Sequence, residues 1–184
     1  RERGLVESEG WAYGAYRAME RIDGDIERAL PRCQRAVEIA EQIGSAFSLA
    51  WALDGLAVVL AHAGHADAVA VAERAVALSR ERNTALEGEA CHLASLAEAC
   101  IATGDAARAC VVAAEAVAVG ERRKTRRWET VAILTRARAL LAAQGAGAAE
   151  AIRTLLDRTE VLAREIAAPN FVPASALGRD GAPP

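Results

Sequence analysis

A glycine followed by a polar residue and an alanine-rich run returns along this chain at almost constant spacing. The pairs are Gly24-Asp25, Gly64-His65 and Gly104-Asp105, and a fourth turn is indicated near Gly145. Positions 24, 64, 104 and 145 are 40, 40 and 41 residues apart. A repeat of this length is typical of helical-repeat proteins, in which one unit cannot bury its apolar face alone and neighbouring copies stack to build a continuous core.

The runs that lead up to these glycines have the apolar spacing of amphipathic helices. Apolar residues recur at i, i+3, i+4 and i+7, as Leu53, Leu56, Ala57 and Leu60 before Gly64 and as Leu93, Leu96, Ala97 and Cys100 before Gly104. This spacing marks one face of a helix, and a glycine after it is typical of a left-handed helix end. The alternation typical of strands is almost absent. The sequence therefore predicts an all-α chain whose unit is helix, turn, helix.

Four such hairpins fit the chain, at about residues 9–45, 46–83, 84–124 and 125–168. Residues 1–8 are interpreted as the end of a preceding helix or a linker, and 169–184 as a Pro- and Gly-rich tail. In the fourth hairpin we expect Ile133, Leu134, Ala137 and Leu141 to form the apolar stripe. Because the chain does not begin with Met, we also expect it to be part of a longer polypeptide.

Small residues recur on the second helix of the first three hairpins. They form pairs seven residues apart, namely Ala29 and Ala36, Ala68 and Ala75, and Ala109 and Ala116. A methyl side chain at such a position lets a neighbouring helix backbone approach closely. The pairs therefore predict tight packing between successive hairpins.

Composition and charge exclude several classes of protein. The formal net charge of −3 and a pI near 5.7 argue against a general polyanion binder. His62 and Gly64 interrupt the most apolar stretch, so no segment approaches the roughly 18 apolar residues that span a membrane, and we expect no membrane partner. The four cysteines form no CxxC pair, which predicts buried thiols in a reducing cytoplasm rather than a disulfide framework or a zinc site.

Residues that carry chemistry are scattered along the chain rather than grouped. The glycines lie in helix–helix turns and form no phosphate-binding loop. The serines lack a matched histidine, and Gly64 separates His62 from His65, which leaves no defined geometry for a metal. We therefore predict no catalytic residue, no cofactor and no metal, and an enzyme with an unrecognised site is the least favoured hypothesis.

The glycine turns and paired alanines resemble those of tetratricopeptide (TPR) repeats, of the longer kind with about forty residues. The segment from Gly24 to Ser45 resembles repeats C-terminal to the ATPase module in bacterial class III adenylate/guanylate cyclases and LuxR-type transcriptional regulators. The likeness covers about residues 9–168, and the chain departs from the pattern at Cys91, where a large aromatic residue is expected. The resemblance implies a right-handed α-solenoid that serves as an interaction and regulatory platform. Any catalytic or DNA-binding domain would then lie outside this chain.

The first helices of the hairpins are expected to line one concave groove. Their register places seven residues along it: Trp51, Asp54, Val58 and His62 from the second hairpin, and Ala94, Glu98 and Ile101 from the third. Large aromatic residues often dominate binding at such surfaces, so Trp51 is a candidate anchor for a partner or ligand. Packing of Trp51 against the first hairpin is the alternative, and the sequence leaves both open.

A run of cations crowds the junction between the third and fourth hairpins: Arg122, Arg123, Lys124, Arg126 and Arg127. It suits an acidic protein surface or phosphate, but a solvated helix end is the simpler interpretation because cations are favourable at a helix C-terminus. The overall acidity argues against nucleic acid. We therefore expect a non-catalytic interaction module that binds another protein or another domain of its own polypeptide. A receptor for a peptide or small ligand is the alternative.

Overall fold

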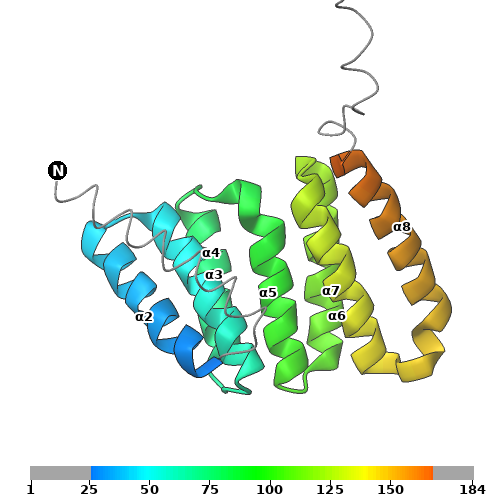
Figure 1. Ribbon diagram of the computed structural model, residues 1–184, viewed down its shortest axis with the longest axis horizontal. Helices are drawn as coiled ribbons and strands as arrows, with labels where there is room; N and C mark the ends of the chain where they lie inside the picture. Colours follow the sequence, from blue (N-terminus) through cyan, green and yellow to red (C-terminus); the bar gives the residue numbers. More distant parts are fainter. Residues whose placement is uncertain (1–25, 168–184) are drawn as a thin grey trace, which may run out of the picture.

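The computed structural model describes residues 26–167, and every regular element in that range is a helix (Figure 1). The predicted all-α class is confirmed for this range. The first helix expected within residues 9–45, and the segments 1–8 and 169–184, lie outside the described residues. The elements are α2 (Ile26–Ile43), α3 (Ala46–His62), α4 (Ala68–Glu81), the 3₁₀ helix η1 (Leu86–Gly88), α5 (Glu89–Ala102), α6 (Ala106–Arg123), α7 (Arg126–Gln144), the 3₁₀ helix η2 (Gly145–Ala148) and α8 (Ala149–Ala167).

The α-helices pack in the order in which they occur in the chain. Each one, from α2 to α7, contacts the next, and α3 also contacts α5 while α5 contacts α7. Helices α3, α5 and α7 therefore form one layer, with α2 and α8 at opposite ends of the molecule in Figure 1. The described chain is a repeat-like series of helical hairpins.

The turns between paired helices close in the same way. Gly64 and Gly104 have φ values of 68° and 84°, in the left-handed region that glycine adopts without a Cβ penalty. The residue after each glycine donates its N–H back to the helix, from His65 to the Leu60 carbonyl and from Asp105 to the Cys100 carbonyl, both at 2.9 Å. This closure satisfies carbonyls that the helix end would otherwise leave unpaired. The left-handed glycines expected at these two turns are confirmed.

Small residues fill the contacts between neighbouring helices. All six paired alanines are buried, with none more than 5% exposed. Gly120 extends the same principle, because a Cβ placed there would lie 2.8 Å from the Cα of Glu129, where α6 crosses the start of α7. The burial of all six paired alanines is in line with the tight packing predicted from the sequence.

Ion pairs connect the second helices of successive hairpins. Arg74 of α4 pairs with Glu41 of α2 at 2.7 Å, and Arg80 of α4 pairs with Glu115 of α6 at 2.6 Å. Two further pairs continue the series, Arg108 of α6 with Glu73 of α4 and Arg158 of α8 with Glu121 of α6. We call these four pairs the outer ion-pair ladder, since they join α2, α4, α6 and α8. Two of its arginines, Arg80 and Arg158, also pair with Glu89 of α5 and Glu129 of α7.

The cysteines divide into two groups. Cys33 and Cys100 are buried as predicted, and burial raises the pKa of the Cys100 thiol. Cys91 and Cys110 are only half-buried, so the expectation of four buried thiols is wrong for these two. No disulfide joins any of the four, all of which lie within residues 26–167.

Candidate functional site

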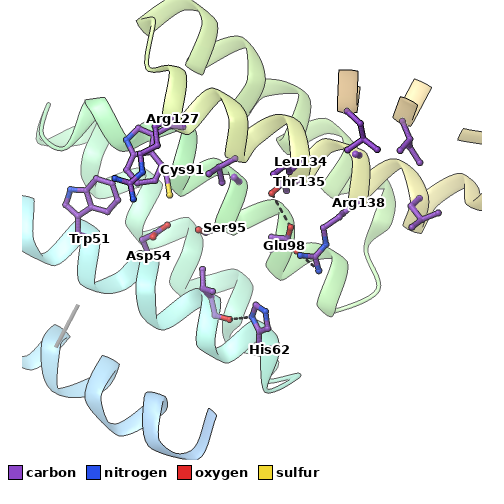
Figure 2. Close-up of a pocket in the computed structure, with 18 residues that line it drawn as sticks. Trp51, Asp54, His62, Cys91, Ser95, Glu98, Arg127, Leu134, Thr135 and Arg138 are labelled. Atoms are coloured by element: carbon purple, nitrogen blue, oxygen red, sulfur yellow. Dashed lines mark hydrogen bonds and ion pairs between the residues drawn. The ribbon is translucent and has the colours of Figure 1, made fainter. Parts of the chain in front are cut away.

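A groove of about 720 Å³ crosses α3, α5 and α7 and reaches α8 (Figure 2). Helices α3 and α5 supply one part of its wall, and α7 and α8 supply the rest. The lining residues are Trp51, Asp54, Val58 and His62 of α3, Cys91, Ala94, Ser95 and Glu98 of α5, Arg127, Trp128, Val131, Leu134, Thr135, Ala137, Arg138 and Leu141 of α7, and Ile152 and Leu156 of α8.

Equivalent positions of three successive hairpins meet in this groove. For three of the four lining residues of α3, all except His62, adding 40 gives a lining residue of α5 and adding 40 again gives one of α7. The resulting sets are Trp51, Cys91 and Val131; Asp54, Ala94 and Leu134; and Val58, Glu98 and Arg138. The groove therefore results from the repeat itself, because the same helix face is presented three times in succession.

The structure places six of the seven predicted groove residues on this wall, all except Ile101. Ile101 is half-buried and packs against the hydrophobic core. It occupies the last turn of α5, whereas the wall that α5 contributes ends at Glu98. The placement expected for Ile101 is therefore wrong, since α5 leaves the groove before its final turn.

Two tryptophans define one end of the groove. The rings of Trp51 and Trp128 have centroids 5.5 Å apart and are tilted by 42°. Trp51 also meets His92 edge-on at 4.7 Å, and a Cβ at Gly88 would overlap its ring. Trp51 therefore packs against the third and fourth hairpins and also lines the groove, so it combines a packing role with an accessible one.

A buried pair lies beneath this aromatic end. Asp54 and His92 are 1% and 0% exposed, and Oδ1 of Asp54 is 3.2 Å from Nδ1 of His92. Neither ring nitrogen of His92 makes a hydrogen bond within the described residues, so the 3.2 Å approach to Asp54 is a close contact rather than a hydrogen bond. The pair brings a polar side chain of α3 against one of α5 below Trp51. The sequence analysis missed His92, whose only signal was its position beside Cys91.

Polar contacts span the middle of the groove between α5 and α7. Glu98 pairs with Arg138 at 3.1 Å and accepts a hydrogen bond from the Thr135 hydroxyl, also at 3.1 Å (Figure 2). His62, at the end of α3, has Nδ1 2.8 Å from the Val58 carbonyl oxygen. A carbonyl only accepts, so Nδ1 of His62 carries a proton and Nε2 is left for other partners.

Aliphatic side chains extend from the middle of the groove to its other end. Leu134 and Leu141 of α7 are 43% and 56% exposed, and Leu156 of α8 is 45% exposed. The expectation that Leu134 and Leu141 belong to the apolar core stripe is wrong, whereas Ile133 and Ala137 are buried as expected. Helices α5, α6 and α8 all contact α7, and the side of α7 that carries Leu134 and Leu141 lines the groove.

The predicted basic run does not act as one patch. Arg123 pairs with Glu89 at 2.5 Å, and Arg126 pairs with Glu129 at 3.1 Å and with Glu165 at 3.2 Å. Arg122 and Lys124 are exposed, and Lys124 caps α6 with a left-handed φ of 55°. Arg127 alone of the five lines the groove, with its guanidinium carbon 4.7 Å from the centroid of the Trp128 ring.

The buried carboxylates that hold these arginines are equivalent residues 40 positions apart. Glu89 and Glu129 occupy the first turns of α5 and α7 and are 4% and 0% exposed. Burial opposes ionisation of Glu89, but hydrogen bonds from Arg123 and Arg80 outweigh it and lower the pKa of that carboxyl. Glu129 is held by Arg126 and by Arg158 of α8. Each carboxylate therefore holds two arginine side chains against the first turn of its own helix.

Other kinds of site were sought in the same part of the chain. Residues 26–167 contain no group of three or more His, Cys, Asp or Glu side chains placed to hold a metal ion. No helix in that range is both long and apolar enough to cross a bilayer. Comparison with known protein families and with curated proteins finds no match for this chain. The groove, with its aromatic, polar and aliphatic sections, is the best-defined candidate site, and its side chains are suited to binding.

Proposed function

We propose that this chain is a non-catalytic helical-repeat module that binds a segment of a partner protein, or of another domain of its own polypeptide, in the groove across α3, α5 and α7. One observation carries the proposal: residues in the same register of three consecutive hairpins line a single groove. A translationally repeated surface of this kind suits an extended partner, since each hairpin offers it the next contact along its length.

The proposed architecture is a right-handed α-solenoid of TPR-like hairpins. Its support is the 40-residue register together with the additional contacts of α3 with α5 and of α5 with α7. By its resemblance to the repeats of bacterial cyclases and LuxR-type regulators, we propose that the module belongs to a larger cytoplasmic signalling protein of bacteria. Binding in the groove would then bias the activity of an attached domain.

A small-molecule ligand is the second candidate, favoured by the size of the groove. A volume of about 720 Å³ falls within the roughly 300–1,000 Å³ typical of such sites. A thermal-shift screen with a metabolite library tests this candidate. A rise in melting temperature that Leu141→Gln abolishes would support it, and a screen without such a compound would contradict it.

A display library of random peptides panned on the wild-type protein tests the main proposal. Each selected peptide is then measured against Leu141→Gln, which alters an exposed groove residue, and against Val111→Gln, which alters a 70% exposed residue of α6 outside the groove. We expect Leu141→Gln to weaken binding roughly tenfold and Val111→Gln to leave it unchanged. Circular dichroism checks that both variants fold.

Two outcomes contradict the proposal. Peptides that bind both variants equally well would locate the binding surface elsewhere on the protein. Failure to select any peptide above background would argue against a peptide-binding groove altogether.

A further inference from the structure

The charged side chains of the groove differ in whether they already contact a group of opposite charge. Arg138 is already paired with Glu98, and Asp54 lies beside His92. Arg127 differs, because no carboxylate of residues 26–167 forms an ion pair with it and its guanidinium instead lies over Trp128. An exposed guanidinium resting on an aromatic face keeps its donors available for a carboxylate. The aromatic end of the groove therefore offers one unused positive charge.

The rest of the groove, toward its opposite end, exposes apolar side chains to solvent. Leu134, Leu141 and Leu156 are three of the exposed large hydrophobic residues in the described part of the chain, and all three line the groove. Grouped apolar side chains at a concave surface are typical of binding sites rather than of an ordinary exterior. Removing them from water favours an aliphatic side chain of a partner.

Helix geometry sets the distance between the two ends. Arg127, Leu134 and Leu141 are successively seven residues apart on α7, which places them on one face of that helix. At 1.5 Å per residue, Leu134 lies about 10 Å and Leu141 about 21 Å along the axis from Arg127. An extended chain covers these distances in about three and six residues.

The length of the groove favours an extended segment over a helical one. An extended chain spans the distance of about 21 Å from Arg127 to Leu141 in about six residues, whereas a helix needs about fourteen. A short extended segment therefore reaches both ends of the groove with the fewest residues.

We infer that the groove recognises an extended peptide segment of a partner protein that carries one acidic residue, with aliphatic residues about three and six positions away. The acidic side chain pairs with Arg127 beside Trp128, and the aliphatic ones contact Leu134, Leu141 and Leu156. This inference rests on the proposed function and adds the chemistry of the partner to it.

Short synthetic peptides provide the test, measured by isothermal titration calorimetry on the full chain. The probe is an acetylated, amidated Gly/Ser peptide with a glutamate and two leucines at every third position, together with the same sequence in reverse order. We expect one direction to bind. Replacing its glutamate by glutamine should weaken binding roughly fivefold at low salt, and replacing its leucines by serine roughly tenfold or more.

Protein variants assign each contact to its end of the groove. Arg127→Gln should weaken the glutamate peptide roughly fivefold and make the glutamate and glutamine peptides equal, as a double-mutant cycle requires for a direct contact. Arg122→Gln is the matched control, because Arg122 belongs to the same basic run but does not line the groove. Leu141→Gln should reduce affinity for the leucine peptide, whereas Val111→Gln should not.

Several results would overturn the inference. They are no binding of either peptide direction, equal weakening by Arg122→Gln and Arg127→Gln, or a preference for lysine in place of glutamate. Its failure is distinguishable from that of the proposed function: library peptides that lack acidic residues but still depend on Leu141 would overturn only the partner chemistry. Library peptides that are indifferent to Leu141 would overturn both.

Discussion

Replacing Gly120 with alanine should destabilise this protein, although the same change in an exposed helix interior would stabilise it. Alanine is favoured over glycine inside a helix by about 1 kcal/mol. At Gly120, however, a Cβ would lie 2.8 Å from the Cα and 3.2 Å from the backbone nitrogen of Glu129. Backbone atoms cannot rotate away, so α6 and α7 must separate, and we expect this overpacking to cost about 2–3 kcal/mol, the upper part of the usual range. We expect a net loss of about 1–2 kcal/mol.

Thermal and urea unfolding followed by circular dichroism measure this effect. For a chain of this size the expected loss corresponds to a fall in melting temperature of about 2–8 °C. Gly147→Ala is the matched control, because a Cβ there meets nothing within 4 Å and the substitution restricts only the unfolded chain. A Gly120→Ala protein as stable as the wild type would refute the close approach of α6 and α7 at this point.

Further predictions concern the buried carboxylates and one strained residue. Folding lowers the pKa of Glu89 below its ordinary value of about 4.5, so its ion pairs stabilise the fold above pH 4.5, and this stabilisation is lost as the pH falls through the lower, folded-state pKa. In urea unfolding from pH 6 to 3, the free energy of unfolding should therefore fall less steeply for Glu89→Gln than for the wild type. Glu129→Gln should cost about 3 kcal/mol in urea unfolding, because Glu129 is fully buried between two arginines, whereas Glu160→Gln at an exposed pair should change stability by less than about 1 kcal/mol. Lys124→Gly should raise the free energy of unfolding by up to about 1 kcal/mol, since it relieves a left-handed φ of 55°; no gain would indicate that Lys124 carries no strain. Ala75→Leu should lower the melting temperature, because Ala75 is fully buried and overpacking costs about 1–3 kcal/mol.

The turns and the small-residue packing could be predicted because local chemistry determines them. Gly64 and Gly104 are needed wherever a helix ends in the left-handed region, and a buried alanine has the same meaning in every hairpin. The 40-residue spacing then assigned equivalent positions of α3 and α5 to the groove, which placed Trp51, Asp54 and Glu98 on one wall. Such features repeat with the sequence, so a single chain is enough to find them.

The parts that were missed depend on contacts between distant residues. Leu134 and Leu141 have the same spacing as core leucines, and only the position of the neighbouring helices decides that they line a groove. Likewise, the basic run contains no sign that Arg123 and Arg126 are held by acidic residues. Arg123 reaches Glu89, 34 residues earlier in the chain, and that pairing follows from helix packing rather than from local sequence.

The outer ion-pair ladder has a mechanical consequence for the groove on the other layer. Its members lie near the surface, with side chains about 40–55% exposed, apart from slightly lower exposure at Arg158. Such pairs are individually weak and are screened by dissolved ions. The ladder therefore holds α2, α4, α6 and α8 together only weakly, and it holds them less strongly as ionic strength rises. A partner that widens the groove between α3 and α7 strains these ion pairs. Higher ionic strength weakens the pairs and should therefore make the groove easier to widen.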